Sequence, residues 1–260
     1  MLKKNKFKKY GHKKKFLRHI IVDDQHRLLY CDVPKVASTN LKRLMLILSG
    51  KITAKQFSSI PRLTVHDNNP MLHLDAFDLT DILKIGRANY SKFIFVRHPY
   101  ERLVSAYQDK LAGDNTFFQK VIGREIVEKY RKKPTQLSLN NGHDVTFPEF
   151  VSYVVDEWKQ NQRQLDVHWR PASDLCLPCS MEYDFIGKFE TMNQDVDFLL
   201  QRLNESYLSN LFKLSKTPTK TTLALWKKSI KEISHQQLSD LNDIFAEDFL
   251  LFGYPQYTDE

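Results

Sequence analysis

Two segments of this chain each read as a strand, a tight turn and a helix, with a charged residue at the turn. The first has an apolar strand over residues 28–33, the turn Pro34-Lys35-Val36 and then leucine at helical spacing. The second has an apolar run over residues 92–96 that ends at Arg97, and Pro99 suits the first turn of the helix that follows. Strands that alternate with helices favour an α/β fold, with a central parallel sheet flanked by helices. In such folds, ligands bind beyond the carboxyl ends of the strands.

The residues at the two turns indicate a ligand with two phosphate groups. Backbone N–H groups at the start of the first helix would face an anion, and Lys35 would add a full positive charge. Arg97 and Ser105 suit a second phosphate, because a guanidinium is a planar fork of donors and a hydroxyl lies on the adjoining helix. The alternatives are an exposed loop lysine, and an arginine that pairs with Glu101 or Asp109. The chain lacks Gly-x-x-x-x-Gly-Lys-Ser/Thr, which argues against an ordinary ATP or GTP enzyme.

Three stretches, in order, resemble the Golgi carbohydrate sulfotransferases, in the branch that modifies chondroitin, dermatan and related glycans. Residues 33–43 (VPKVASTNLKR) are similar to that family's 5′-phosphosulfate loop, and residues 95–110 (FVRHPYERLVSAYQDK) are similar to its 3′-phosphate motif. The third stretch, residues 168–191, begins with His168-Trp169 and contains Cys176 and Cys179. Three ordered matches are more specific than one loop. The resemblance implies a P-loop-like sulfotransferase fold.

The resemblance also implies an enzyme, a glycan O-sulfotransferase that takes its sulfuryl group from 3′-phosphoadenosine 5′-phosphosulfate. The implied acceptor is a sugar hydroxyl of a glycan, such as the galactosaminoglycans chondroitin and dermatan. A non-catalytic glycan-binding relative is the alternative, and the intact Lys35, Arg97 and Ser105 favour the enzyme. No metal is expected, because sulfuryl transfer does not require one in principle and no convincing carboxylate or histidine cluster is present. The predicted donor-binding residues are Pro34, Lys35, Val36, Ala37, Ser38, Thr39, Asn40, Arg97, Ser105 and Lys220.

Lys35 and His66 are predicted to act in the transfer itself. Lys35 would donate to the oxygen that bridges phosphate and sulfuryl, where negative charge grows. His66 is the first choice as general base for the acceptor hydroxyl, because it aligns with a histidine of the relatives and titrates near neutral pH. A surface or structural histidine is the alternative. His168 and Trp169 are predicted to contact the acceptor, with the tryptophan ring stacked on a sugar. A buried tryptophan beside a hydrogen-bonded histidine fits the sequence equally well. His98 is expected to be structural.

The positive charge of the chain is concentrated at its start. The net charge is +8, yet residues 1–18 hold nine Lys or Arg and no acid, which leaves 30 of the 39 basic residues against all 31 acidic ones. We therefore expect a basic, disordered arm over residues 1–18 and a single domain over residues 19–260. No nucleic-acid partner is expected, because the arm has few aromatic residues and no recognisable binding fold follows it. Membrane association is expected only through the arm or a missing anchor.

No stretch approaches the ~20 apolar residues that span a bilayer, and the lysine-rich start has no hydrophobic signal region. The resemblance nevertheless implies the Golgi lumen, with which two Asn-x-Ser sequons, at Asn89 and Asn204, are compatible. Of the three cysteines, Cys176 and Cys179 either bond to each other or are free thiols. Cys31, in an apolar strand, is expected to be a small buried side chain.

Periodicity and capping patterns predict the remaining elements. They are a hairpin over residues 20–33, helices near residues 79–83, 114–140, 147–158, 196–203 and 234–249, and a short strand at residues 185–189.

Overall fold

The structure is a computed structural model that describes residues 17–66, 69–160, 165–212 and 220–257. The chain divides into two compact units. The first unit comprises Met1–Arg97 and Ala172–Lys216, and the second comprises His98–Pro171 and Thr217–Glu260. The predicted basic arm lies outside the described residues except for its last two positions. The prediction of one domain stays a prediction.

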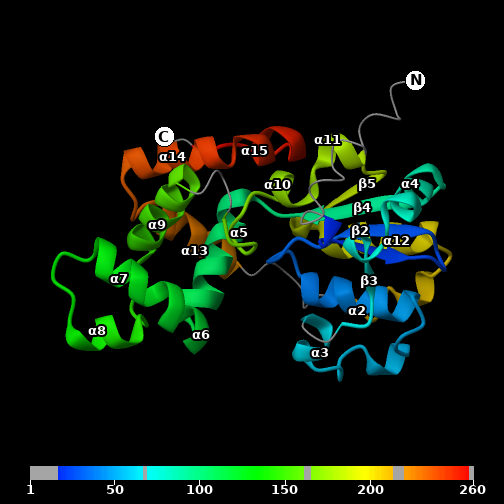
Figure 1. Cartoon of the computed structure of the whole chain (residues 1–260), viewed down its shortest axis with the longest axis horizontal. Helices are drawn as coiled ribbons and strands as arrows, with labels where there is room; N and C mark the ends of the chain where they lie inside the picture. The colour runs from blue at the N-terminus through cyan, green and yellow to red at the C-terminus, as the bar shows by residue number, and fades with distance from the viewer. Residues whose placement is uncertain (1–16, 67–68, 161–164, 213–219, 258–260) are drawn as a thin grey trace. The chain divides into compact units, whose positions relative to one another are not determined.

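The first unit is built on a five-stranded sheet in the order β3-β1-β2-β4-β5 (Figure 1). β1 (Ile20–Asp23) and β2 (Leu28–Cys31) form the predicted antiparallel hairpin. β4 (Ser91–Val96) pairs in parallel with β2 and with β5 (Phe185–Lys188), and β3 (Leu72–His73) pairs antiparallel with β1. The predicted α/β fold is confirmed, with β2, β4 and β5 as its parallel strands and an antiparallel edge formed by β1 and β3.

Helices flank this sheet, and in Figure 1 α2 runs below the strands with α3 beneath it. β2 is fully buried because it is an inner strand covered on both faces, which explains its continuous apolar run. The apolar side chains of α2 at Leu41, Leu44, Met45 and Leu48 are also buried, as their spacing predicted. The α-helices in the described part of the first unit are α2 (Ser38–Leu48), α3 (Arg62–His66), α4 (Leu79–Arg87), α10 (Ala172–Cys176), α11 (Pro178–Met181) and α12 (Met192–Arg202).

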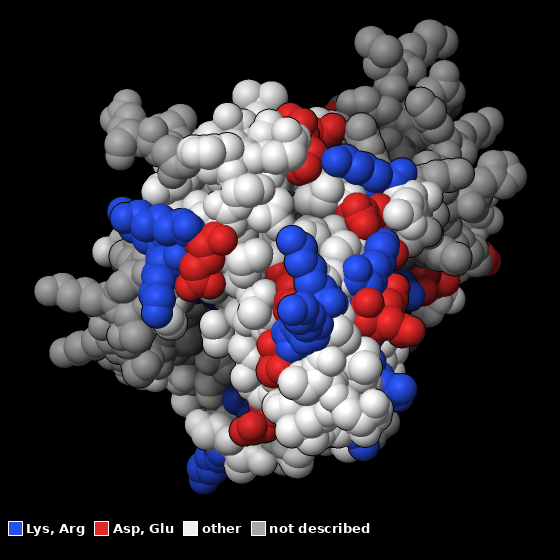
Figure 2. Space-filling view, turned by 90° about the vertical axis from the view of Figure 1, so that its left-hand side faces the viewer, with Lys and Arg blue, Asp and Glu red and all other residues white. Residues whose placement is uncertain are grey.

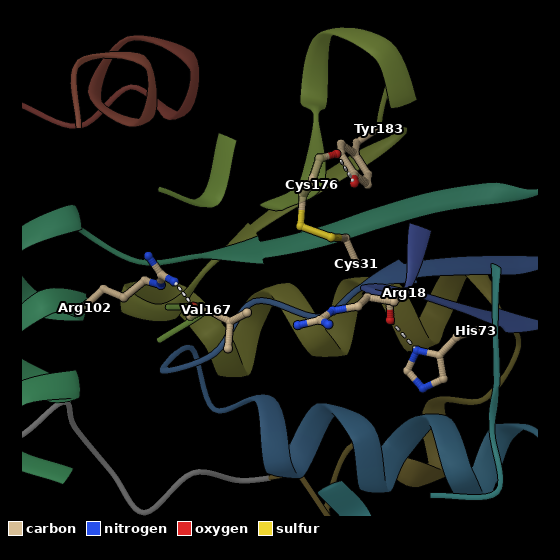
Figure 3. The surroundings of a disulfide bond; sticks show 7 residues. All are labelled: Arg18, Cys31, His73, Arg102, Val167, Cys176 and Tyr183. Atoms are coloured by element: carbon tan, nitrogen blue, oxygen red, sulfur yellow. Dashed lines mark hydrogen bonds between the residues drawn. A yellow bond between two sulfur atoms is a disulfide. The ribbon is translucent and has the colours of Figure 1, made fainter. Parts of the chain in front are cut away.

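A disulfide joins Cys31, the last residue of β2, to Cys176 at the end of α10 (Figure 3). The two Cα atoms are 5.9 Å apart, although 145 positions separate the residues in the sequence. Cys179 is free and exposed. Cys31 is buried, as expected, but it is bonded rather than a lone side chain. A local Cys176–Cys179 bond is wrong; the free-thiol alternative holds for Cys179 but not for Cys176. The hydroxyl of Tyr183 donates to the carbonyl oxygen of Cys176 at 2.7 Å, which fixes the end of α10 from the other side.

The second unit is helical in its described residues. α5 (Pro99–Tyr107) continues into a π-helical turn, Gln108–Ala112, and packs against α13 (Lys220–Ile230). α9 (Phe147–Gln160) packs against α14 (His235–Ile244), and the two helices supply much of a large aromatic and aliphatic core. The predicted helical insertion near residues 114–140 is confirmed. Its helices are α6 (Thr116–Phe118), α7 (Arg124–Tyr130) and α8 (Gln136–Asn141).

The last predicted helix is interrupted. Its start is confirmed, because Ser234 and Gln237 form the capping box, with each backbone N–H bonded to the other side chain at 3.0 and 3.2 Å. At Phe245, α14 gives way to a second helix, α15 (Ala246–Phe252). Phe245 and Phe249 both stay buried, so the apolar pattern located the buried face but not the break.

Charged side chains of both signs are intermixed on the face drawn in Figure 2, rather than gathered by sign. Some oppositely charged side chains of the second unit form ion pairs, such as Arg131 with Glu149 at 2.7 Å and Lys159 with Asp240 at 3.0 Å. Among the described residues, no helix is long and apolar enough to cross a bilayer.

Candidate functional site

The first predicted loop leads from β2 into α2 through two residues with left-handed backbone. Lys35 has a φ of 72°, and Ala37, the N-cap of α2, has a φ of 59°. Non-glycine residues in this region cost about 1–3 kcal/mol, and such strain clusters at functional sites. Among the described residues, no side chain caps the N-terminus of α2, and its first turn contains no acid. The start of α2 therefore presents backbone N–H groups and a partial positive charge to an anion in front of it.

Arg97 joins the second predicted turn to the first. It follows β4, and in the parallel register Cys31 of β2 lies opposite Ile94 of β4, so both strands end at the same edge of the sheet. The side chain of Arg97 is buried, and its Nη1 donates to the carbonyl oxygen of Lys35 at 3.3 Å. Its guanidinium carbon lies 4.2 Å from the centre of the Phe189 ring, a cation–π contact. The arginine and the lysine loop that the sequence predicted as two phosphate sites are thus in direct contact.

A polar network lies on the other side of the loop. Thr39 Oγ1 and His66 Nε2 are 2.8 Å apart, and Lys42 Nζ lies 3.4 Å from His66 Nδ1. Lys42 also forms an ion pair with Asp32 at 2.6 Å, and both of these side chains are buried. The structure therefore brings His66, which ends α3, into contact with Thr39 of the predicted donor loop.

The other residues of the predicted donor loop have fewer ways to contact a ligand. Val36 is a core side chain with no exposed surface, so it could contact a ligand only through its backbone. Ser38 is buried, and Pro34 is half-buried. The side chain of Asn40 accepts a hydrogen bond from Arg43 Nη1 at 3.3 Å, within α2. Lys35 and Thr39 are the loop residues whose half-buried polar side chains suit a ligand best.

Ser105 and Lys220 belong to the second unit. Ser105 is half-buried on α5. Lys220 is the first residue of α13, but its side chain and the stretch before it, residues 213–219, lie outside the described residues. The donor-binding roles of both residues stay predictions.

His168 is held in a tight turn of the second unit. Asp166 Oδ1 accepts hydrogen bonds from the backbone N–H of His168 at 2.9 Å and from its Nδ1 at 2.7 Å. Because a carboxylate only accepts, Nδ1 carries the hydrogen and Nε2 is the acceptor. Burial acts to raise the pKa of Asp166, but the hydrogen bonds from His168 outweigh it and hold that pKa below its usual value. Arg102 is fully buried and donates to the carbonyl oxygen of Val167 at 3.1 Å (Figure 3). It also donates to the carbonyl oxygen of Arg170 at 2.6 Å.

Trp169 is a core residue. Its side chain is 1% exposed, and its ring meets Phe150 edge-on with the ring centres 5.3 Å apart. The prediction that this ring stacks on a sugar is wrong, because no face of the ring is open to one; the alternative of a buried tryptophan is confirmed. His98 is buried and stacks on Trp226 with the ring centres 4.9 Å apart inside the same unit, which is consistent with the structural role expected for it.

Asp32, Lys42, Phe189 and Asp166 were not predicted as site residues. Lys42 carries the clearest signal, because it is a charged residue beside the apolar positions of α2 and inside the quoted 33–43 motif. Phe189 lies inside the quoted 168–191 stretch, but no local pattern links it to Arg97, because only the fold brings the end of β5 to that arginine. Among the described residues, no group of three or more His, Cys, Asp or Glu side chains is arranged to hold a metal ion.

Comparison with known proteins identifies the family. The chain matches the model of the sulfotransferase family over residues 18–255. It is 39% identical over 245 residues to carbohydrate sulfotransferase 11 of Mus musculus, a match that covers 93% of this chain and 69% of the mouse protein. It is 36% identical over 258 residues to carbohydrate sulfotransferase 9 of Homo sapiens, covering 95% of this chain and 57% of the human protein. It is 34% identical over 261 residues to carbohydrate sulfotransferase 12 of Xenopus laevis, covering 94% of this chain and 61% of the frog protein. No solved structure gave a significant match. The chain therefore belongs to the sulfotransferase family and, with these carbohydrate sulfotransferases as relatives, is an enzyme of that class.

Proposed function

We propose that this enzyme transfers a sulfuryl group from 3′-phosphoadenosine 5′-phosphosulfate to a hydroxyl of a galactosaminoglycan such as chondroitin or dermatan. The observation that carries the proposal is the strained loop before α2, which leaves the helix N-terminus without a side-chain cap in the described structure and lies in contact with Arg97. This arrangement suits an anion with two charged ends. The donor supplies an activated sulfuryl group, and the protein has to align it and neutralise developing charge.

The residues divide this work. Backbone N–H groups of residues 36–39 and the Thr39 hydroxyl would hold the 5′-phosphate at the start of α2. Lys35 would donate to the bridging oxygen as the bond to the sulfuryl group breaks, a contact that strengthens in the transition state. Arg97 would bind the 3′-phosphate, with Ser105 and Lys220 as further predicted ligands. The ring of Phe189 supports Arg97 by packing against the face of its guanidinium.

His168 would contact the glycan acceptor. Asp166 fixes its ring, so that Nε2 is the atom able to accept from a sugar hydroxyl. The role of His66 as general base stays a prediction. Its Nε2 contacts Thr39 and its Nδ1 contacts Lys42, so the ring would have to give up one of these contacts to accept a proton from the sugar.

The proposed location is the Golgi lumen. The disulfide between Cys31 and Cys176 is typical of an oxidising compartment, and both sequon asparagines, Asn89 and Asn204, are exposed. Treatment of the protein made in a eukaryotic secretory system with an amide-cleaving glycosidase should lower its apparent mass; an unchanged mass would leave the location without this support.

A transfer assay with labelled donor tests the function. We expect label to enter desulfated chondroitin or dermatan, but not heparosan, because heparosan lacks galactosamine. Adenosine 3′,5′-bisphosphate should compete with the donor. If the protein binds chondroitin and the nucleotide yet transfers no label to any of the three glycans, the non-catalytic alternative is correct.

A further inference from the structure

Behind the Thr39 hydroxyl, polar side chains from three elements form a row. Thr39 is the second residue of α2, His66 ends α3, Lys42 lies one turn further along α2, and Asp32 follows β2. The successive separations are 2.8 Å from Thr39 to His66, 3.4 Å from His66 to Lys42 and 2.6 Å from Lys42 to Asp32. A row of this kind ties the start of α2 to a buried ion pair.

The chemistry of Lys42 fixes the hydrogen on the imidazole of His66. An ammonium has three donors and no acceptor, so His66 Nδ1 must accept from Lys42. The neutral ring then carries its hydrogen on Nε2, and Nε2–H donates to Thr39 Oγ1. A threonine hydroxyl can accept and donate at once, so the Thr39 O–H remains available to donate to a ligand in front of α2.

This arrangement fits poorly with His66 as a base. A proton taken up at Nδ1 would face the ammonium of Lys42, and Nε2 already carries a hydrogen. To accept a proton from a sugar, the ring would have to give up its contact with Lys42. As a support for Thr39, in contrast, the ring uses both of its contacts as they stand.

We propose that His66 is a positioning residue of the donor site, which orients the Thr39 hydroxyl toward the 5′-phosphate of the nucleotide and is itself fixed by Lys42 and Asp32. The inference rests on the proposed function, because it takes the nucleotide as the ligand of the loop. It differs from the sequence prediction in the step affected: His66 acts on donor binding rather than on proton removal from the acceptor.

The first test uses the parent protein. Nitrogen-15 NMR correlations of the His66 ring at pH 8 should show hydrogen on Nε2 and a lone pair on Nδ1. The opposite tautomer would overturn the proposal, and this result does not depend on whether any variant folds.

The second test compares His66→Ala with His66→Gln, whose amide N–H can replace Nε2–H but is not basic. In calorimetric titration with adenosine 3′,5′-bisphosphate, His66→Ala should bind about five- to tenfold more weakly, the scale of one lost hydrogen bond. His66→Gln should stay within about threefold of the parent in affinity and in turnover, and its pH–rate profile should keep the parental shape. His143→Ala, which alters an exposed histidine of the second unit, is the matched control.

A double-mutant cycle with Thr39→Val completes the test, because His66→Ala should have less than about a twofold further effect once the hydroxyl is absent. If both His66 variants lose turnover about 100-fold or more with unchanged nucleotide affinity, His66 is the base and the proposal is wrong. If the parent binds the nucleotide but the losses of Thr39→Val and His66→Ala multiply independently, the inference alone is overturned. A parent that does not bind the nucleotide overturns the proposed function and this inference together.

Discussion

Removal of the disulfide between Cys31 and Cys176 should lower the free energy of unfolding by several kcal/mol. The bond closes a loop of 145 residues, for which the chain-entropy model gives about 5 kcal/mol. Native disulfides that have been removed from proteins typically cost about 2–5 kcal/mol, so we expect a loss of about 3–5 kcal/mol in Cys31→Ala/Cys176→Ala. Both side chains are buried, and alanine leaves a small apolar group at each position, which limits other effects of the change.

Urea unfolding followed by fluorescence measures this loss, after peptide mapping without reductant has verified the bond in the parent. Cys179→Ser is the control, because Cys179 is exposed and unbonded and should change stability by less than about 0.5 kcal/mol. Nucleotide affinity should fall as well, because Cys31 ends the strand that leads into the donor loop. A double variant that unfolds at the same urea concentration as the mapped, oxidised parent would refute the reasoning.

Three further predictions address the transfer and the stability of the second unit. Lys35→Ala should lower turnover about 100-fold or more while weakening adenosine 3′,5′-bisphosphate binding less than about tenfold, because the contact strengthens in the transition state; parental turnover would remove Lys35 from the mechanism. His168→Ala should chiefly raise the Michaelis constant for the glycan in steady-state assays, and a loss confined to kcat would make His168 a candidate base. Arg131→Ala should cost about 1–3 kcal/mol at pH 7, because Arg131 pairs with Glu149. Burial acts to raise the pKa of Glu149, but the Arg131 and Thr146 hydrogen bonds lower it overall, so this stability is present above about pH 4.3 and lost as pH falls further. Urea unfolding of parent and variant at pH 7 and pH 3 should show the difference shrinking, and an equal difference at both pH values would contradict the assignment.

The sequence was sufficient for the elements that carry the donor site. All of β2 and the last four residues of β4 are buried, so an unbroken apolar run leads into each turn, and helical periodicity begins directly after it. The chemistry at those turns depends on residues close together in the sequence, and for that reason Lys35 and Thr39 could be placed at the start of α2. The start of α14 could also be predicted, because the capping box of Ser234 and Gln237 is a local sequence pattern.

What the sequence did not predict depends on contacts between distant residues. Cys31 meets Cys176 only because β2 and α10 belong to one unit, whereas the Cys-x-x-Cys spacing suggested a local pair. Trp169 looked free to stack on a sugar because aromatic burial is not visible in a segment without periodicity. The contact of His66 with Lys42 could not be foreseen, because no local pattern links the end of α3 to α2.

The most direct test of the central claim, that the α2 loop and Arg97 bind opposite ends of one nucleotide, is calorimetric titration of Arg97→Ala with two ligands. Adenosine 3′,5′-bisphosphate should lose about 1.5–3 kcal/mol of binding free energy, the scale of a charge-assisted hydrogen bond. Adenosine 5′-phosphate lacks the 3′ group, so the fold-loss in its affinity should be at least about ten times smaller than that of the bisphosphate. A small loss should remain, because Arg97 also bonds to the carbonyl oxygen of Lys35. Equal losses for the two nucleotides would contradict the claim and leave Arg97 as a structural support of the loop.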